Sequence, residues 1–391
     1  MSPIKCVILK PGKDKAIKNK HHWIFSGAIS ELPDFNDGDI LPVHSSTGEF
    51  LGKGYFNHKT SIRGRMLTFD ERDPLEVISQ NMDAAIQLRK TLFDRQNTNA
   101  YRLINGEGDF LPGLILDQYH DVLVIQIATM GMDRLRTFII EQLIKKLQPR
   151  AIYEKSTQPS RKEEGLGAVE SFHIGPELKE VNIVENGLRF IVSLTEGQKT
   201  GFFLDHREMR LLVQQMAKGK RVLNCFAYTG GFSVFAAAGQ ALSTVSVDIS
   251  EKAVSLSKSN LLLNQIDPFS HTCVKADVFH YLRENKLDYD LIILDPPAFA
   301  KKQKDVMQAC RGYKDINRLA MQKMPPKSLL LTSSCSYYVD ESLFQKVVFQ
   351  AAVEANRKVR IIERHRQAFD HPINLCHPEI DYLKSFLLYV E

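Results

Sequence analysis

The pattern of apolar and polar positions in the first half of the chain predicts two kinds of structure. In residues 1–72, short apolar runs such as CVILK and SIRGRMLTF alternate with turn signals rich in Gly and Asn, which is typical of a small β-rich domain. Residues 74–97 then carry apolar side chains at helical spacing. Strand-like segments follow on either side of a helix at about 133–147. We therefore expect a middle α+β domain at residues 73–190.

From about residue 220 the pattern becomes a regular alternation of strands and helices. Apolar runs predict strands at 221–227, 243–249, 271–277, 289–295, 328–335, 359–363 and 385–390. Such alternation predicts an α/β domain with a mainly parallel sheet covered by helices on both faces. We assign residues 191–391 to this domain. In such a sheet, ligands bind beyond the carboxyl ends of the strands.

The first three strand ends carry residues that suit a nucleoside ligand. Gly230 and Gly231 follow the first strand, where glycine allows the backbone to approach a ligand, although a tight turn explains the pair equally well. Asp248 ends the second strand and can accept hydrogen bonds from both ribose hydroxyls, with Ser250 as the expected helix cap. Asp277 ends the third strand, where it can receive an adenine amino group or cap the next helix.

The next two strand ends carry candidate reactive groups. Asp295 precedes two prolines, which stiffen the turn and fix the direction of the carboxylate, and Asp-Pro-Pro at a strand end is typical of methyltransferases that act on bases. Cys335 ends the fifth strand among serines, where a cysteine is a candidate nucleophile. The alternative is a buried structural cysteine, which we expect of Cys225 and Cys273. The ordered succession of these residues after successive strands argues against a purely structural explanation.

Composition adds the distribution of charge to this picture. The 391 residues include 51 basic and 46 acidic side chains, a net charge of +5. Basic residues concentrate in 1–22, which includes Lys5, and in 301–318. Each stretch suits a phosphate backbone or simply a solvated face.

The six cysteines form no CxxC pair, so we expect no metal site. The N-terminus lacks the apolar core of a signal peptide. No apolar run reaches the roughly 20 residues that span a bilayer. We therefore expect a cytoplasmic protein with reduced thiols and no membrane partner.

The chain resembles the bacterial ribosomal RNA large subunit cytosine-5 methyltransferase I family in the motifs VLNCFAYTGGFSVFAA, VSVD, LDPPAFAKK, CRGYKDIN and TSSCS. Near the N-terminus, HHWIFSGAI and GKGYFN are similar to the PUA domain of that family, a small RNA-binding barrel. The resemblance spans essentially the whole chain. LDPPAF and TSSC are shared with related families, whereas CRGYKDIN and the N-terminal motif are specific.

The resemblance implies a PUA domain at 1–72, the middle domain, and a class I (Rossmann-like) methyltransferase domain with a seven-stranded sheet. The last strand, SFLLYV, is expected to run antiparallel between its neighbours. The implied cofactor is S-adenosyl-L-methionine and the implied substrate is one cytosine of 23S ribosomal RNA; a homodimer is expected from the family alone. EGQKTGFFLDHRE (196–208) is similar to a segment that contacts the cofactor. The implied cofactor-binding residues are Lys199, Phe226, Ala227, Tyr228, Thr229, Gly230, Gly231, Asp248, Ile249, Asp277, Val278 and Asp295.

The expected chemistry assigns Cys335 and Asp295 as catalytic residues. The Cys335 thiolate adds to carbon 6 of the cytosine and makes carbon 5 nucleophilic, while Asp295 holds the edge of the base. Ala298 stands where many cytosine-5 RNA enzymes carry a second cysteine, so another base, Asp295 or a water, must release the product. We expect Trp23 in the core of the PUA domain rather than as a stacking platform. The expected contacts to the RNA backbone are Lys13, Lys20, Lys301, Lys302, Arg311 and Lys314.

Several alternatives remain open at this level. Enzymes that methylate carbon 5 of uridine also carry a cysteine after the fifth strand, with an acidic base near the C-terminus for which Glu379 is a candidate. An RNA methyltransferase acting on guanine nitrogen, or on another ring or exocyclic nitrogen, would not need Cys335. A small-molecule methyltransferase would leave the PUA-like segment without a purpose. An inactive RNA-binding module is disfavoured, because the candidate cofactor positions are all present. The modified nucleotide, and whether the substrate is free RNA or the assembled subunit, are not determined.

Overall fold

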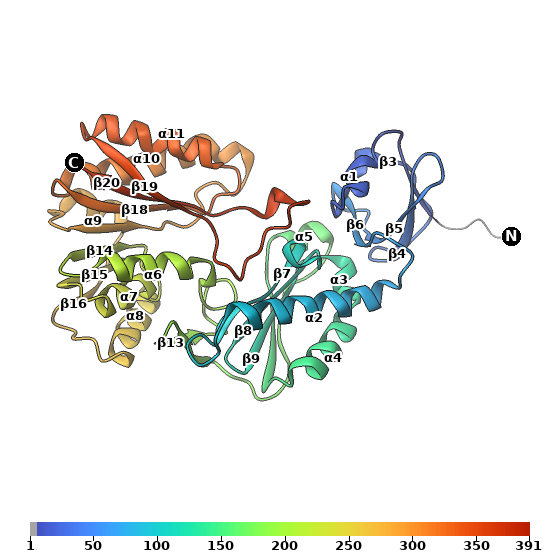
Figure 1. Ribbon diagram of the computed structural model, residues 1–391, viewed down its shortest axis with the longest axis horizontal. Coiled ribbons are helices and arrows are strands. Elements are labelled where there is room, and N and C mark those ends of the chain that lie inside the picture. Colours follow the sequence, from blue (N-terminus) through green and yellow to red (C-terminus); the bar gives the residue numbers. More distant parts are fainter. Residues whose placement is uncertain (1–5) are drawn as a thin grey trace. The chain divides into compact units, whose positions relative to one another are not determined.

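The computed structural model describes residues 6–391, which form two compact units, each discontinuous along the chain (Figure 1). The first unit holds the chain up to Val184 together with 192–204 and 369–380. The second holds 185–191, 205–368 and 381–391. Lys5 of the basic N-terminal stretch lies outside the described residues. In residues 6–391, no helix is long and apolar enough to cross a membrane.

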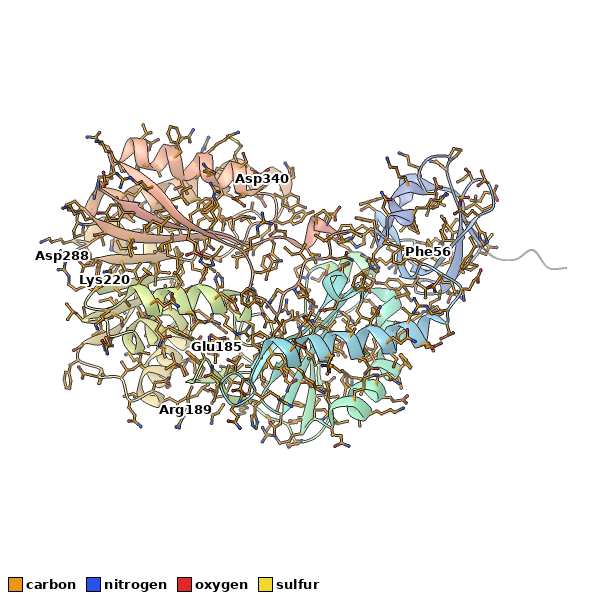
Figure 2. The ribbon with its side chains drawn as sticks, in the orientation of Figure 1. Phe56, Glu185, Arg189, Lys220, Asp288 and Asp340 are labelled. Atoms are coloured by element: carbon orange, nitrogen blue, oxygen red, sulfur yellow. The ribbon has the colours of Figure 1, made fainter. Side chains whose placement is uncertain are left out.

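The first unit begins with a six-stranded sheet in the order β2-β6-β5-β4-β1-β3. Its pairs are antiparallel except for β1 with β4. Phe56, labelled in Figure 2, is fully buried in the core of this sheet. The prediction of a small β-rich domain is confirmed. Its elements are β1 (Val7–Leu9), α1 (Lys15–Lys18), β2 (Trp23–Phe25), a 3-10 turn (Ser26–Ala28), β3 (Ile29–Glu31), β4 (Ile40–His44), β5 (Phe50–Phe56) and β6 (Ile62–Thr68).

A five-stranded sheet follows in the same unit, in the order β11-β10-β9-β8-β7. The predicted helix at 74–97 is present but ends at Leu92, and the helix predicted at about 133–147 is two helices, α3 and α4. The elements are α2 (Pro74–Leu92), β7 (Ala100–Asn105), a 3-10 turn (Gly106–Asp109), β8 (Leu114–Tyr119), β9 (Val122–Ile127), α3 (Met130–Arg134), α4 (Arg136–Leu147), β10 (Ala151–Ser156), α5 (Ser160–Glu164) and β11 (Val169–Ile174). Then β12 (Glu180–Glu185) and β13 (Leu188–Ser193) form a two-stranded sheet.

A carboxylate is buried in this five-stranded sheet. The Glu154 side chain on β10 is fully buried, and it accepts hydrogen bonds from Nε2 of His173 at 2.7 Å and Nε of Arg136 at 3.0 Å. Burial alone would raise the pKa of Glu154. The hydrogen bonds from His173 and Ser156 and the charge of Arg136 outweigh that effect, so the pKa lies below its usual value. Glu154 is therefore a carboxylate that stabilises the fold in its ionised form.

The second unit is built on a seven-stranded sheet in the order β16-β15-β14-β17-β18-β20-β19. All the predicted strands of this region are present. The expectation for the last strand is confirmed, because β20 lies antiparallel between β18 and β19. The elements are a 3-10 turn (Leu204–His206), α6 (Arg207–Met216), β14 (Arg221–Cys225), α7 (Gly231–Ala238), β15 (Ser243–Asp248), α8 (Glu251–Leu263), β16 (His271–Lys275), α9 (Val278–Glu284), β17 (Leu291–Leu294), a 3-10 turn (Gln303–Asp305), α10 (Val306–Lys323), β18 (Ser328–Ser334), α11 (Glu341–Glu354), β19 (Val359–His365) and β20 (Lys384–Val390); a last 3-10 turn, Pro378–Ile380, belongs to the first unit.

Alternate residues of the central strands bury against opposite layers of helices. On β17, Ile292 and Leu294 pack with α9, α10 and α11, whereas Leu291 and Ile293 pack with α6 and α7. This explains why LIIL has no polar position: both faces of the strand are covered. The sheet is therefore doubly wound, as predicted.

Different residues lie where the parallel strands of this sheet begin and where they end. Lys220 and Asp288, labelled in Figure 2, precede β14 and β17 and mark the edge where those strands begin. Arg221 at that edge pairs with Asp288 and with Asp290, whose Oδ2 accepts from Nε at 3.1 Å. The candidate reactive residues all follow the opposite edge, where the parallel strands end.

Candidate cofactor and nucleophile site

The loop after β14 has an unusual backbone. Phe226, Tyr228 and Gly230 have positive φ angles of 57°, 46° and 76°. This region costs a non-glycine residue about 1–2 kcal/mol, so surrounding contacts must hold Phe226 and Tyr228 in place. The backbone N–H of Ala227 donates to the carbonyl of Val247 at 3.0 Å, and that of Gly230 to Ala227 at 2.8 Å. Strain retained at a strand end is typical of a ligand-binding loop.

Asp248 ends β15 and faces this loop. Its Oδ2 accepts the backbone N–H of Tyr228 at 2.8 Å, and its Oδ1 accepts that of Ser250 at 2.9 Å. The two bonds orient the carboxylate and leave lone pairs on both oxygens for further donors. Ser250 caps α8 through the N–H of Ala253 at 3.3 Å, so the prediction that Ser250 caps this helix is confirmed.

Asp277 begins α9 and caps it, because its Oδ1 accepts the N–H of His280 at 2.9 Å. This is one of the two roles expected of it; the contact with an adenine stays a prediction. Ile249 is 67% exposed, although it is large and apolar, and so offers a surface for an apolar ring. Val278 is buried in the core of the sheet, which leaves its backbone as the part able to contact a ligand.

Asp295 follows β17 in the Asp-Pro-Pro turn. Its Oδ2 lies 3.3 Å from Nε2 of His206. The ring of His206 is buried and packs edge-on against Phe232, with centroids 5.8 Å apart. His206 therefore helps to fix the direction of the Asp295 carboxylate. The sequence reasoning missed His206, although it lies within EGQKTGFFLDHRE, the segment singled out for its resemblance.

Cys335 follows β18 directly, beside the Asp-Pro-Pro turn. Its Sγ lies 3.8 Å from the carbonyl oxygen of Pro296. The neighbouring Ser336 ties the two strand ends together, because its Oγ accepts the N–H of Ala300 at 3.1 Å and lies 2.9 Å from the hydroxyl of Tyr313. Since β17 and β18 are adjacent parallel strands, the thiol and the turn meet at one edge of the sheet.

We expected Cys225 and Cys273 to be buried structural cysteines, and the expected burial is found for Cys225 but not for Cys273. Cys225 is fully buried, and burial raises the pKa of its thiol, as expected of a structural cysteine. Cys273 is only partly buried, and its Sγ lies 3.3 Å from Oγ of Ser257. Its strand, β16, is at the edge of the sheet, which explains the incomplete burial.

Five strand ends of one sheet thus bring together the loop at 226–231, Asp248, Asp277, Asp295 and Cys335. Lys199 belongs to the first unit, where its Nζ lies 4.4 Å from the centroid of the Phe203 ring. Its contact with the cofactor stays a prediction.

The candidate RNA-binding residues are mostly exposed: Lys13, Lys20, Lys301, Lys302 and Arg311. Lys314 is half-buried and paired with Glu354 at 2.6 Å, which partly neutralises its charge. Lys20 lines a cavity of about 290 Å³ together with Phe69 and Arg72, and its Nζ lies 5.1 Å from the Phe69 ring centroid. Arg72 is paired at 2.7 Å with Asp70, which also lines this cavity, so Lys20 and the Phe69 ring are the parts of the lining that suit a nucleotide.

The expectation that Trp23 belongs to the core of the small barrel is wrong. Ile24 is buried there instead, because neighbouring residues of a strand point to opposite faces. Trp23 is half-buried. Its Nε1 donates to Oε1 of Glu107 at 2.9 Å, and its ring packs edge-on against His377, with centroids 4.4 Å apart.

Within residues 6–391, one group of three side chains is close enough together to hold a metal ion. It consists of His21, His377 and Glu379, whose ligand atoms lie within 4.8 Å of one another. Nδ1 of His21 accepts the backbone N–H of Trp23 at 3.1 Å. In a neutral ring, Nε2 must then carry the proton and donate it to Glu379 at 3.2 Å. Hydrogen bonds therefore use both nitrogens of His21, and we assign no metal to the cluster.

Comparison with known proteins agrees with the fold. A family of S-adenosylmethionine-dependent methyltransferases matches residues 162–372, and a PUA-like domain matches residues 7–69. Ribosomal RNA large subunit methyltransferase I of Aliivibrio fischeri is 40% identical over 387 residues, covering 97% of this chain and 98% of the relative. The protein of the same name from Photobacterium profundum is 39% identical over 393 residues, covering 98% and 99%.

Two solved structures match this chain over almost its whole length. A Streptococcus mutans protein, assigned as a SAM-dependent methyltransferase, superposes with a TM-score of 0.84 at 27% identity and covers 98% of this chain and 99% of its own. SMU.776, also assigned as a methyltransferase and solved with S-adenosylhomocysteine, gives 0.85 at 26% identity with the same coverage. The chain belongs to the S-adenosylmethionine-dependent methyltransferases, in the family of ribosomal RNA large subunit methyltransferase I. Its cofactor is S-adenosylmethionine.

Proposed function

We propose that this protein methylates carbon 5 of a cytosine in large-subunit (23S) ribosomal RNA, with Cys335 as the nucleophile. The relatives named above have ribosomal RNA in their names, and the PUA-like domain is the part of the chain that we expect to bind RNA. The observation that carries the choice of chemistry is the position of Cys335, whose Sγ lies 3.8 Å from the Pro296 carbonyl of the Asp-Pro-Pro turn. A methyltransferase acting on a nitrogen would have no use for a thiol there.

The residues at the strand ends fit the cofactor by their chemistry. Asp248 offers two oriented oxygens to the ribose hydroxyls, Ile249 an exposed apolar surface to the adenine, and Asp277 an acceptor to its amino group. The strained loop at 226–231 follows β14 directly, and the glycines at its end allow the backbone to approach the ligand. S-adenosylmethionine supplies a methyl group bonded to a positively charged sulfur.

In the proposed reaction, the Cys335 thiolate forms a bond from Sγ to carbon 6 of the cytosine. The electron pair of the 5,6 double bond moves toward carbon 5, and Asp295 holds the ring edge and favours protonation at nitrogen 3. Carbon 5 would then take the methyl group, whose bond to the cofactor sulfur breaks so that S-adenosylhomocysteine is the leaving group. A base removes the carbon-5 proton, the bond from Sγ to carbon 6 breaks, the 5,6 double bond returns, and nitrogen 3 gives up the proton that it gained. Asp295 and a water molecule are the candidates for that base, since Ala298 replaces the second cysteine.

The target base must leave its stack to reach this edge of the sheet. Lys301, Lys302 and Arg311 follow the Asp-Pro-Pro turn and would hold the RNA backbone near Cys335, while Lys13 and Lys20 would hold it on the barrel. The division into PUA-like (1–72), middle (73–190) and methyltransferase (191–391) domains belongs to this proposal. A homodimer and a cytoplasmic location stay predictions.

The test is methylation of naked 23S ribosomal RNA with tritiated S-adenosylmethionine, followed by digestion to nucleosides. We expect label in 5-methylcytidine, lost in Cys335→Ala and retained in Cys376→Ala, which removes an exposed cysteine. Label in 5-methyluridine would mean the uridine rival, and label in a methylated guanosine the guanine-nitrogen rival. Full activity of Cys335→Ala would make this cysteine structural.

A second experiment addresses the covalent bond directly. RNA containing 5-fluorocytidine has no carbon-5 proton to lose, so a protein–RNA adduct should accumulate and survive denaturing electrophoresis. The adduct should require both S-adenosylmethionine and Cys335. If no adduct forms while ordinary RNA is methylated, the thiolate mechanism is wrong.

A further inference from the structure

Lys384 is a buried lysine at the start of β20. It is 6% exposed and lies opposite Ser334 in the antiparallel ladder with β18. Its Nζ donates to the carbonyl oxygens of Ser336 at 2.8 Å and Tyr382 at 2.7 Å. Cys335 lies between Ser334, which pairs with Lys384 in the ladder, and Ser336, whose carbonyl accepts the hydrogen bond from Lys384.

Burial and the surrounding charges act in opposite directions on the pKa of Lys384. Burial lowers the pKa of Lys384, and the negative charge of an ionised Cys335 is the largest of the effects that oppose this lowering. Three carboxylates act in the same direction: Asp381, Asp340 (Figure 2) and Glu341. Because Coulomb attraction is mutual, an ammonium stabilised by the thiolate stabilises the thiolate to the same extent.

Tyr313 is the second titratable group that interacts with Cys335. Its hydroxyl lies 2.9 Å from Oγ of Ser336. Burial raises the pKa of Tyr313, so the phenol is neutral in the pH range in which a thiol ionises. Tyr313 therefore adds no negative charge beside Cys335, whereas Lys384 adds a positive one.

We propose that Lys384 is a positioning residue for Cys335, whose buried ammonium favours the thiolate and holds it beside the Asp-Pro-Pro turn. Among the described residues 6–391, the carbonyl groups of Ser336 and Tyr382 accept hydrogen bonds from the Lys384 ammonium. Its third N–H group can therefore donate to the thiolate or to the substrate. The thiol proton leaves to solvent, and the ammonium keeps its own protons. The catalytic use of this thiolate rests on the proposed function, whereas its ionisation does not.

The experiment measures the pH dependence of alkylation of Cys335 by iodoacetamide in the full-length protein, read by peptide mass spectrometry. Alkylation requires the thiolate. Lys384→Met should raise the midpoint of the Cys335 profile by about one pH unit and slow its alkylation at neutral pH about tenfold. An unchanged midpoint in a folded Lys384→Met protein would overturn the proposal.

Lys323→Met is the matched control. Nζ of Lys323 also donates to backbone carbonyls, of Leu282 at 2.8 Å and Asn285 at 3.2 Å, and these carbonyls belong to α9 and the residue that follows it, not to the residues that flank Cys335. The control should lose comparable hydrogen bonds from a lysine ammonium to backbone carbonyls, here between α10 and the end of α9, while leaving the Cys335 midpoint unchanged. If both variants shift the midpoint equally, Lys384 has only a structural role.

If Lys384→Met does not fold, the wild-type protein still tests the proposal. Cys376 is exposed and serves as an internal reference, and Cys335 should titrate at a lower pH than Cys376 in the same samples. A higher midpoint for Cys335 would overturn the proposal. The methylation assay separates this proposal from the proposed function. If Lys384→Met shifts the midpoint of Cys335 alkylation but Cys335→Ala keeps full methylation activity, the proposed function is wrong and the interaction between the thiolate and the ammonium is still supported.

Discussion

Replacing Gly230 by alanine tests whether the strained loop after β14 is packed as the structure shows. A Cβ at Gly230 would lie 2.2 Å from Oγ and 3.0 Å from Cβ of Ser257, which is 1% exposed on α8. The φ angle of +76° adds a backbone penalty. The same substitution at Gly219 provides the control, because Gly219 has a φ of +70° and nothing within 4 Å of the added Cβ.

The two variants separate the backbone penalty from the steric one. The left-handed conformation costs alanine about 1–2 kcal/mol, and the reduced freedom of the unfolded chain returns about 0.4–1 kcal/mol. Gly219→Ala should therefore lose about 1 kcal/mol of unfolding free energy. Gly230→Ala should lose about 1–3 kcal/mol more, since the clash with Ser257 requires α8 or the loop to move.

Unfolding should be followed by circular dichroism in urea. The only tryptophan, Trp23, lies in the first unit and does not report the second. The dissociation constant for S-adenosylmethionine should rise at least about tenfold in Gly230→Ala, which corresponds to about 1.4 kcal/mol. Adding Ser257→Ala removes the closest atom and should restore part of the stability beyond additivity.

Two outcomes would refute this reasoning. If Gly230→Ala is as stable as Gly219→Ala, the loop is not packed against Ser257 as described. If Gly230→Ala loses stability and still binds the cofactor like the wild type, the loop does not belong to the cofactor site.

Three further predictions concern buried charges and thiols. Glu185 (Figure 2) accepts two hydrogen bonds from the buried Arg210, at 2.6 and 2.8 Å, and its Oε2 lies 3.5 Å from Nε of Arg207. Arg210→Met removes both hydrogen bonds and leaves Arg207 as a partner of the carboxylate, so it should lower the unfolding free energy by about 1.5–3 kcal/mol, with partial rescue by Glu185→Gln in a double-mutant cycle. Because the folded pKa of Glu154 is depressed, its carboxylate stabilises the fold above its usual pKa of 4.5 and this stability is lost as the pH falls through the folded pKa. Glu154→Gln should cost roughly 1–3 kcal/mol at neutral pH and flatten the acid limb of the urea midpoint; an unchanged acid limb would contradict this. Cys225 should resist alkylation in the native protein while Cys376 reacts, since burial raises the pKa of Cys225 and shields it; equal rates by mass spectrometry would contradict the burial.

The elements that could be predicted from the sequence are those whose signal is local. The strands of the second unit were predicted to within a few residues, because a strand buried on both faces must be an unbroken apolar run whichever strand lies beside it. The cap at Ser250 was predictable for the same reason, since a capping side chain contacts a backbone N–H only a few residues along the chain. The order of Gly-Gly, Asp, Asp, Asp-Pro-Pro and Cys after successive strands placed the candidate site at one edge of the sheet.

The tertiary structure decided which residues act on those side chains. His206 lies 89 positions before its partner Asp295, and Lys384 lies 48 positions after Ser336; neither pairing has a period or a spacing that a sequence can display. The positive φ angles of Phe226 and Tyr228 are likewise invisible, because neither residue prefers that conformation. The prediction for Trp23 was wrong because the alternation along a strand separates its residues into two faces but does not show which face packs against the core. A local pattern thus determined the strands and the chemistry at their ends, whereas the environment of Asp295 and Cys335 depends on contacts that form only when the chain folds.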